Sequence, residues 1–519
     1  MLRGRRRTAT KPSQQPATDT TLATGEGGVD RAWYLRTNPD VAAAGVDPVE
    51  HYLRYGWREG RDPRPDFSTS LYLDAHKDVE GNPLVHYLLG SGEAHPQPVA
   101  DWHRLWTKGF LHLKGGQAFP SNATFGSHGG SKLLFTGHDA SRTGAPLILL
   151  RLMEAIQSLT GAELYLILER GGPLLDDYRR IAHVVVNRNG FLYLPDGPNL
   201  AGFLNLIVAP GPELAICNSA DSWRLVVALR EAGLPYLVSL VHERVVHYPP
   251  DVWQSLHRNS NRIVLPAEAV KAATMVELPY FEDALVVPQG LLKPEFGGGD
   301  ESAARIELRN RLGLPPDAAI ILGCGTQDMR KGIDLFVQLA ARVRAQCRQD
   351  VHFVWLGAQD RGGHFAKLLQ LDIALLKLGS TVSLLDEVTD PEPYFLAADA
   401  FALTSRDDPF PCVIHEAMAC ALPIVVFDGA GGAKEAIADG CGIVVPYLDI
   451  EAMGLALTAI VENPAQYAVM GQRARSRVHS VYRFSVYAER IKAICDAVIG
   501  QQMVLHTQED PGDQPRLPS

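Results

Sequence analysis

The pattern of hydrophobic and polar positions divides the chain near residue 130. From Lys132 to about Pro288, short apolar runs alternate with amphipathic stretches, and the same alternation returns over residues 318–480. The runs are KLLFTG, LYLILE, HVVV, LAICN and YLVSLVH, then AIILGCG, VHFVWLG, TVSLL, AFALTS, PIVVFD and GIVVP. Apolar strands separated by helices are typical of parallel sheets covered on both faces. We therefore predict an α/β fold with two doubly wound, Rossmann-like domains that face a cleft.

A different pattern precedes these domains. The stretch WYLRTNPDVAAAGVDPVEHYLRYG is answered by LYLDAHKDVEGNPLVHYLLG, so that Tyr34 recurs as Tyr72, Asp40 as Asp78, Pro48 as Pro83 and His51-Tyr52 as His86-Tyr87. Each copy predicts two short helices, with the proline at the start of the second. The sequence thus predicts a small α-helical repeat module. Because its histidines recur together with aromatic residues, packing is favoured over chemistry, and docking to a membrane, an acceptor or a partner is a hypothesis.

Composition supplies the remaining boundaries. We expect, in order, a disordered tail (1–28), the helical repeat module (29–100), the first Rossmann-like domain on the acceptor side (130–288), a linker rich in Gly and Pro at both ends of one short polar helix (289–317), the second Rossmann-like domain on the donor side (318–480), a C-terminal helix (481–500) and a disordered tail (501–519).

Charge and cysteine content restrict the partners and the location. The net charge of −10 argues against nucleic acid as a partner. Seven scattered cysteines without a CxxC pair favour reduced thiols in the cytoplasm. No apolar run is long enough to span a bilayer, and none follows the first arginines as a secretory signal requires. Peripheral contact with anionic lipid on the inner face of the plasma membrane is the less favoured alternative, carried by Arg3, Arg5, Arg6 and Arg7.

The first turn of the second domain, GCGTQDMRKGIDLF, places Lys331 directly before a helix expected to begin near Ile333. A cation at this end opposes the helix dipole, so the position makes sense if an anion such as a diphosphate lies between the lysine and the helix amides. A solvated surface lysine explains this feature about equally well.

The stretch RDDPFPCVIHEAMACALPIVVFDGAGGAKEAI, residues 406–437, places Glu416 in an otherwise apolar helix. A buried carboxylate is costly unless it is paired or hydrogen-bonded. It could pair with a core cation, it could accept from the backbone of a neighbouring loop, or it could accept the two hydroxyls of a ribose. Asp408 lies in the preceding loop, and Gly431 and Gly432 follow the next strand, where backbone amides can approach an anion or a sugar.

The first domain shows a similar arrangement of strand, turn and helix in TGHDASRTGAPLILL. Gly144 permits close approach, and the polar edge of this loop is formed by His138, Asp139 and Ser141. His242 ends the run YLVSLVH at the predicted cleft. A histidine at a strand end is more often structural, and only the position of His242 favours a role in the site.

At these residues the chain resembles the retaining glycosyltransferases of family four, also called glycosyl transferases group 1, which have the GT-B fold. The resemblance covers roughly residues 130–497 and is most specific over 400–445. There Asp408 occupies the position of the family's usual glutamate, and the stretch EAMACALP follows it. It implies transfer of a hexose-type sugar from a nucleotide-sugar to an acceptor hydroxyl with retained configuration, in bacterial surface polysaccharide or glycoconjugate synthesis. It implies no metal and no cofactor, and a glycan, lipid-linked or other hydroxyl acceptor.

The resemblance also implies roles for the matching residues. Lys331 would contact the donor diphosphate, Glu416 the ribose, and Asp408 with the Gly431 and Gly432 amides the sugar. His242 would lie near the transferred sugar, and GHDASRTGAP looks like the acceptor-side loop. The family places an arginine where this chain has Thr326, so Arg330 is the candidate replacement. The 30–98 repeat resembles modules found beside bacterial glycosyltransferases.

The sequence leaves two other functions open. A nucleotide-sugar epimerase would keep the architecture and change the reaction, whereas a phosphorylase is disfavoured because no pyridoxal-binding lysine motif is present. A non-catalytic sugar-binding or scaffold protein would act through the repeat module. The sequence fixes neither the base, the sugar nor the acceptor.

Overall fold

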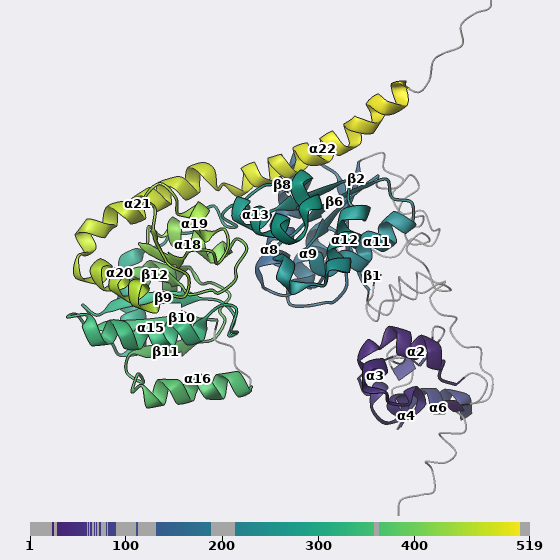
Figure 1. Ribbon diagram of the computed structural model, residues 1–519, viewed down its shortest axis with the longest axis horizontal. Coiled ribbons are helices and arrows are strands. Elements are labelled where there is room, and N and C mark those ends of the chain that lie inside the picture. Colours follow the sequence, from purple (N-terminus) through teal and green to yellow (C-terminus); the bar gives the residue numbers. More distant parts are fainter. Residues whose placement is uncertain are drawn as a thin grey trace, which may run out of the picture. The chain divides into compact units, whose positions relative to one another are not determined.

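We describe a computed structural model of the chain (Figure 1). It describes residues 23–24, 28–59, 111–112, 131–187, 213–357 and 363–508, with scattered positions between 61 and 89, and no side chains beyond residue 500. The predicted tail at 1–28 therefore lies almost entirely outside the described residues, as do residues 509–519. Two compact units are present: Met1–His128 with Ile167–Arg170 and His183–Gly211, and Gly129–Leu166 with Gly171–Ala182 and Pro212–Ser519.

The first unit contains short helices packed on aromatic side chains. They are α2 (Arg31–Thr37), α3 (Pro39–Ala44), α4 (Pro48–His51), the π-helical turn η1 (Tyr52–Gly56) and α6 (Pro83–Leu89). Their core consists of Tyr34, Val41, Tyr52, Phe67, Tyr72 and Leu84. This unit also holds β1 (Leu111–His112) and β4 (His183–Val186), which pair in antiparallel fashion.

Two polar contacts recur among these helices. The Tyr34 hydroxyl lies 2.9 Å from His51 Nδ1, and the Tyr72 hydroxyl lies 2.8 Å from His86 Nδ1. The prolines that begin α4 and α6 each follow a side chain that caps backbone amides. Asp47 Oδ1 accepts from the amides of Val49 and Glu50 before α4, and Asn82 Oδ1 accepts from those of Leu84 and Val85 before α6.

The second unit begins with a sheet in the order β3-β2-β5-β6-β7-β8, in which the neighbours from β2 to β8 pair in parallel. The strands are β2 (Lys132–Gly137), β3 (Glu163–Leu168), β5 (Leu214–Asn218), β6 (Tyr236–Leu240), β7 (Arg262–Leu265) and β8 (Leu285–Val286). Its helices and turns are α8 (Gly144–Thr160), α9 (Leu175–Ile181), η4 (Ala220–Ser222), α11 (Trp223–Glu231), η5 (Val245–His247), α12 (Pro250–Asn259), α13 (Glu268–Glu277) and η6 (Pro279–Asp283). Helix α8 packs on β2 and β5.

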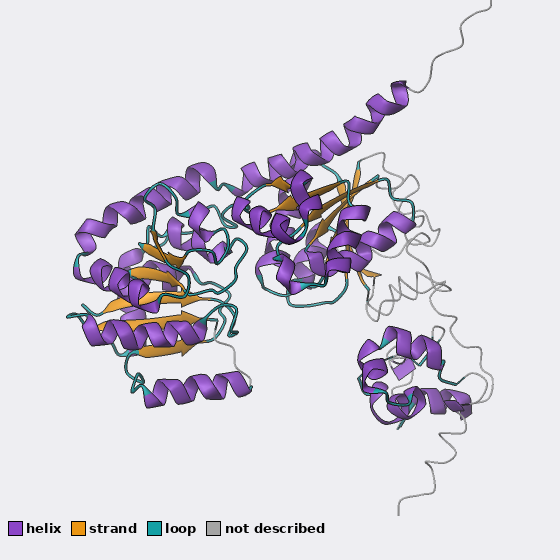
Figure 2. Cartoon of the chain, viewed as in Figure 1, coloured by secondary structure: helices purple, strands orange, loops and turns teal. Residues whose placement is uncertain are grey.

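The second sheet is parallel throughout, in the order β11-β10-β9-β12-β13-β14. Figure 2 shows its strands in orange and the helices beside them in purple. Its strands are β9 (Ala319–Cys324), β10 (Val351–Leu356), β11 (Val382–Leu385), β12 (Ala400–Leu403), β13 (Ile424–Phe427) and β14 (Ile443–Val445). Its helices are α14 (Glu301–Leu312), α15 (Ile333–Gln346), α16 (His364–Leu375), α17 (Glu392–Ala397), α18 (Cys412–Ala419), α19 (Ala433–Ala436), α20 (Ile450–Glu462) and α21 (Pro464–Val481). The two parallel, Rossmann-like sheets confirm the α/β part of the predicted fold class.

Two helices connect these parts of the second unit. Helix α14 lies within the segment predicted as a linker, and it packs against α17. Arg309 Nη2 on α14 donates to Oδ2 of Asp399, which follows α17, at 2.8 Å. Helix α22 (Phe484–Gln508) packs against α8, far away in the sequence, and extends beyond its predicted end at residue 500. No helix among the described residues combines the length and apolar character needed to cross a bilayer.

Candidate functional site

The strand order of the second sheet determines where a ligand can enter. β10 and β11 lie to one side of β9 while β12 lies to the other, so the chain changes direction between β9 and β12. In open parallel sheets, ligands bind beside the carboxyl ends of the strands at such a switch point. The loop after β9 carries Lys331 and the loop after β12 carries Asp408. Two residues predicted from the sequence therefore meet at this edge.

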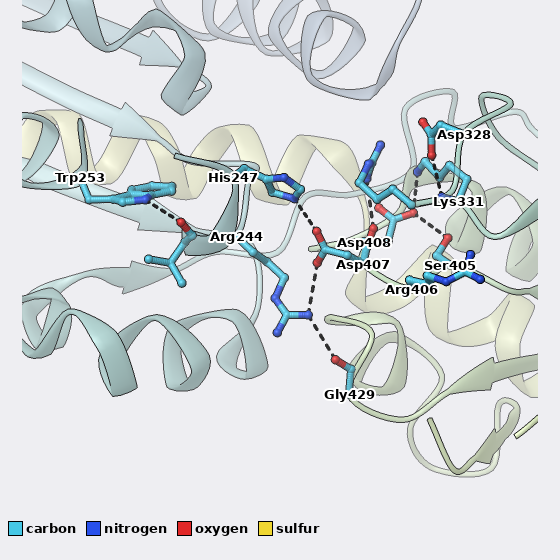
Figure 3. A network of polar contacts seen from close by, with 12 residues as sticks. Arg244, His247, Trp253, Asp328, Lys331, Ser405, Arg406, Asp407, Asp408 and Gly429 are labelled. Carbon is cyan, nitrogen blue, oxygen red and sulfur yellow. Dashed lines mark hydrogen bonds and ion pairs between the residues drawn. The ribbon is translucent and has the colours of Figure 1, made fainter. Parts of the chain in front are cut away.

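Lys331 and Asp408 form an ion pair in which Lys331 Nζ lies 2.6 Å from Asp408 Oδ2 (Figure 3). Asp408 is only 6% exposed, and the Ser405 hydroxyl lies 3.3 Å from the same oxygen. A carboxylate this buried requires compensation, which the ammonium provides. The pair places one positive and one negative group side by side at the switch point.

Lys331 is held at the start of α15 by its backbone. Its amide donates to Asp328 Oδ1 at 2.8 Å, which places a carboxylate near the positive end of the helix dipole. Gly332 follows with a φ of 72°, and an added Cβ there would lie 2.0 Å from the Thr404 carbonyl oxygen. Only glycine fits this position, so the turn that presents Lys331 packs directly on the end of β12.

The glycine turn after β13 is joined to the loop that carries Asp408. The Asp408 amide donates to the Ala430 carbonyl at 2.8 Å, and the Gly432 amide donates to the Pro409 carbonyl at 2.8 Å. Gly431 has a φ of 144°, and a Cβ there would lie 1.9 Å from the Asp408 carbonyl oxygen. The Gly432 amide is therefore already engaged, whereas the Gly431 amide has no hydrogen-bond partner in the part of the chain that the structure describes.

Glu416 lies on α18, where the sequence predicted a buried carboxylate. The residue is half-buried rather than buried as predicted, and its side chain receives no hydrogen bond and forms no ion pair within the described residues. Burial raises the pKa of Glu416 to about 7, and the charge of Lys293 opposes this shift only in part. The internal salt bridge considered from the sequence is thus not formed, and the carboxylate can accept hydrogen bonds from a ligand.

The first sheet presents its own polar group at the ends of β5 and β6. His242 Nε2 lies 2.8 Å from Asn218 Oδ1, and burial lowers the pKa of His242 while the neighbouring Glu243 opposes and His138 reinforces this effect. Glu243 accepts from the amides of Ala220 and His242, both at 2.9 Å. These contacts hold the loop after β6 against the loop after β5.

The loop predicted to lie on the acceptor side follows β2. His138 Nε2 lies 3.6 Å from Asp139 Oδ1, and the same oxygen accepts from the Ser141 amide at 3.0 Å and from the Ser141 hydroxyl at 2.8 Å. Gly144 begins α8, and a Cβ there would lie 3.8 Å from Cys412 Sγ on α18. The start of α8 therefore lies close to the helix that carries Glu416.

An ion-pair network that the sequence does not predict links the first sheet to these loops (Figure 3). Arg244 Nη1 donates to Asp407 Oδ1 at 3.2 Å and to the Gly429 carbonyl at 3.3 Å, while His247 Nε2 lies 2.5 Å from Asp407 Oδ2. Asp407 precedes Asp408, and Gly429 precedes the turn at Gly431. The contact thus connects the loop after His242 to the loop that carries Asp408 and to the glycine turn after β13.

Arg330 uses part of its guanidinium within the protein. Its Nη1 donates to the Asp407 carbonyl at 3.1 Å, and its own carbonyl accepts from the Arg406 amide at 2.8 Å. The side chain therefore braces the loop that carries Asp408. Among the described residues, no group of three or more His, Cys, Asp and Glu side chains converges as metal ligands would.

Comparison with known proteins identifies part of this chain. Residues 304–477 match the family model of glycosyl transferases group 1. These residues form a group 1 domain. The match includes Lys331, Asp408, Glu416 and the glycine turn, so the candidate site of the second sheet lies within the group 1 domain.

Relatives with curated functions match only part of their length. D-inositol 3-phosphate glycosyltransferase of Kineococcus radiotolerans is 32% identical over 209 residues, which cover 37% of this chain and 47% of the relative. The lipopolysaccharide core biosynthesis mannosyltransferase LpcC of Rhizobium leguminosarum is 25% identical over 240 residues, which cover 45% of this chain and 64% of the relative. The chain thus spans less than two thirds of these relatives.

Solved structures extend the likeness to both sheets. HepE of Anabaena, in complex with UDP and glucose, superimposes with a TM-score of 0.62 at 20% identity and covers 71% of this chain and all of its own. WaaG, a glycosyltransferase involved in lipopolysaccharide biosynthesis, superimposes with a TM-score of 0.52 at 13% identity and covers 70% of this chain. At such identities the likeness shows the fold alone, which is the predicted GT-B fold around the group 1 domain.

Proposed function

We propose that this protein is a retaining glycosyltransferase that moves a sugar from a nucleotide-diphosphate-sugar to an acceptor hydroxyl. The observation that carries the proposal is the pairing of Lys331 with Asp408 at the switch point of the group 1 domain. A cation at the amino end of α15 suits a diphosphate. The neighbouring Glu416, without an internal partner, suits a ribose diol.

Each residue then has a distinct task in the reaction. As the glycosidic bond breaks, the leaving diphosphate gains negative charge, and Lys331 with the amino end of α15 stabilises that charge most at this moment. Asp408 and the Gly431 amide hold the sugar. The Gly432 amide is not assigned this task, because it donates to Pro409. Arg330 can reach a phosphate only with the guanidinium donors that Asp407 leaves free.

The first sheet supplies the acceptor side in this proposal. His242 lies near the transferred sugar, and the loop with His138, Asp139, Ser141 and Gly144 borders the acceptor. The names of the relatives support a hexose donor: HepE was crystallised with UDP-glucose, and LpcC is a mannosyltransferase. They also support a role in bacterial surface polysaccharide or glycoconjugate synthesis, with a glycan, a lipid-linked saccharide or another hydroxyl compound as acceptor.

We also propose the predicted domain boundaries and the repeat module. The recurring Tyr–His contacts and capped prolines of the first unit support two copies of one helical motif. A cytoplasmic location, with or without peripheral contact of Arg3 to Arg7 with the membrane, stays a prediction, since those residues lie outside the described ones.

A panel of labelled nucleotide-sugars tests the function. UDP-glucose and GDP-mannose are first screened for thermal stabilisation, because a ligand bound by the folded state raises its Tm. Products formed with a crude glycolipid or glycan acceptor are then analysed for transfer and anomeric configuration. Transfer with retention, lost in Lys331→Ala and kept in the surface variant Lys492→Ala, supports the proposal. Epimerised donor without transfer, or binding without turnover by the wild type, contradicts it.

A further inference from the structure

Asn218 lies at the end of β5 and is completely buried. Its amide nitrogen Nδ2 lies 3.1 Å from the carbonyl oxygen of Ala145, the second residue of α8. Its oxygen Oδ1 lies 2.8 Å from His242 Nε2. One buried side chain therefore joins the start of α8 to the imidazole that follows β6.

These two contacts decide which imidazole nitrogen of His242 carries the proton. A carbonyl oxygen can only accept, so the group facing Ala145 must be the NH₂ of Asn218. The group facing His242 is then the amide oxygen, which also only accepts. His242 Nε2 must therefore donate, and in a neutral ring the other nitrogen, Nδ1, carries a lone pair.

His242 Nδ1 is buried and has no hydrogen-bond partner among the described residues. A buried acceptor without a partner is costly and calls for a ligand or a water. The charged and titratable groups beside the ring are Glu243 and His138. The Glu243 carboxylate accepts from the Ser219 hydroxyl and from two backbone amides. Neither Glu243 nor His138 is hydrogen-bonded to Nδ1.

We propose that Asn218 is a positioning residue that holds His242 as the Nε2–H tautomer, so that Nδ1 accepts the hydrogen of a substrate hydroxyl. The inference rests on the proposed function for the identity of that substrate. The hydroxyl belongs either to the transferred sugar or to the acceptor, since both meet at this edge. The opposite tautomer would present an N–H to the hydroxyl and leave Asn218 Oδ1 without its donor.

NMR of protein labelled with ¹⁵N-histidine tests the tautomer without any substrate. The wild-type signals of His242, assigned through their loss in His242→Gln, should show a protonated Nε2 and an unprotonated Nδ1. In Asn218→Ala the preference for this tautomer should be lost, and kcat for transfer should fall about tenfold with a smaller change in the donor KM.

Asn261→Ala is the matched control. Asn261 Oδ1 accepts from the Leu237 amide at 2.9 Å and from Arg230 Nη2 at 2.7 Å, at the opposite end of β6. This variant should lose stability but keep both the tautomer and kcat. Asn218→Asp keeps an acceptor for His242 Nε2 and should favour the imidazolium, so the His242 titration and the pH profile of kcat should move to higher pH.

Comparing UDP-glucose and GDP-mannose with UDP and GDP distinguishes the two sources of the hydroxyl. A change of the Nδ1 signal with a nucleotide-sugar but not with its nucleotide assigns the donor sugar, and a change only on adding acceptor assigns the acceptor. A protonated Nδ1 in the wild type overturns the inference, and so does a tautomer that survives Asn218→Ala. Absence of transfer with the predicted tautomer in place refutes the proposed function instead.

Discussion

Lys331 Nζ lies 2.6 Å from Asp408 Oδ2, so the cation proposed for the diphosphate and the acid proposed for the sugar are paired with each other. A bound diphosphate must compete with Asp408 for the lysine. Both groups are mostly buried, with 17% and 8% of their side chains exposed, so their interaction is screened less than that of a surface pair. This competition predicts opposite effects of removing either partner.

Asp408→Asn should bind UDP or GDP about three to ten times more tightly, because Lys331 is released and a negative charge near the diphosphate is removed. Transfer should nevertheless fall by at least about a hundredfold, since the sugar loses a carboxylate contact. Lys331→Ala should weaken nucleotide binding and lower the Tm, because Asp408 is left buried without its cation. Calorimetric titration with UDP or GDP measures nucleotide binding by both variants. Weaker nucleotide binding by Asp408→Asn than by the wild type would contradict the competition.

Glu416 predicts how binding depends on pH. Its pKa is raised to about 7 from an ordinary 4.5. Between these pH values the folded protein holds a proton on Glu416 that the unfolded chain has released. The stabilisation from this proton is therefore lost as the pH rises through 7. A ribose diol binds the carboxylate form, so nucleotide binding should release a proton and tighten as the pH rises from 6 to 8.

Glu416→Gln should bind nucleotide more weakly and without this pH dependence. Calorimetry in two buffers of different ionisation enthalpy measures the released proton directly. A wild-type binding enthalpy that does not change between the buffers near pH 6.5 would show that the Glu416 carboxylate does not bind the nucleotide.

The contact of Arg244 with Asp407 predicts an effect on catalysis larger than its effect on stability. The two side chains are 27% and 15% exposed, so the ion pair should contribute about 0.2–1 kcal/mol to stability. It nevertheless joins the loop after His242 to the loop of Asp408. Arg244→Ala and Asp407→Asn should each lower kcat several-fold, and their effects should not add in the double variant.

A charge exchange provides the control for this ion pair. Arg244→Asp combined with Asp407→Arg should recover part of the kcat lost in either single variant. Additive losses in a double-mutant cycle, measured as kcat and as Tm, would show that the two loops act independently.

His415 predicts a local weakness at low pH. It is 1% exposed, lies against Phe410 and Tyr482, and neither ring nitrogen has a hydrogen-bond partner in the described chain. Burial lowers its pKa from 6.5 to about 3. The unfolded chain therefore binds the additional proton, and stability should fall below pH 6.5 by up to about 1.4 kcal/mol per unit.

His415→Leu should raise the Tm by about 2–5 °C and flatten this dependence, because two unsatisfied nitrogens are removed. His352 is the matched control, since it is 5% exposed but has both nitrogens within 3.2 Å of Ser380 and Ser383 oxygens. His352→Leu should lower the Tm. Equal effects of the two variants, measured by thermal denaturation between pH 5 and 8, would contradict this account.

The sequence predicted the strands well because their signal is local. A strand buried on both faces appears in the sequence as a continuous apolar run whose limits are local. The strands β2, β4, β5 and β9 therefore begin at the predicted residues. Strand β7 was missed because RIVL is short and begins with an arginine. Lys331 and Glu416 could be found because each is a charged residue in a setting that disfavours charge, whereas Asp408 was found by its place in the loop before the helix of Glu416.

Residues defined by long-range pairing could not be found in this way. Arg244 and Asp407 are 163 positions apart in sequence, and each is an ordinary loop residue on its own. Asn218 is a common residue at a strand end, and its significance comes only from Ala145 and His242. The engaged Gly432 amide was likewise not predictable, because its partner Pro409 belongs to another loop.

Crystals grown with UDP or GDP give the most direct test of the central claim that the edge of the second sheet binds a nucleotide diphosphate. We predict the diphosphate within hydrogen-bonding distance of Lys331 Nζ, at the start of α15, and both ribose hydroxyls on the Glu416 carboxylate. A nucleotide bound elsewhere, with Lys331 still paired to Asp408 and Glu416 without contact, would contradict the account.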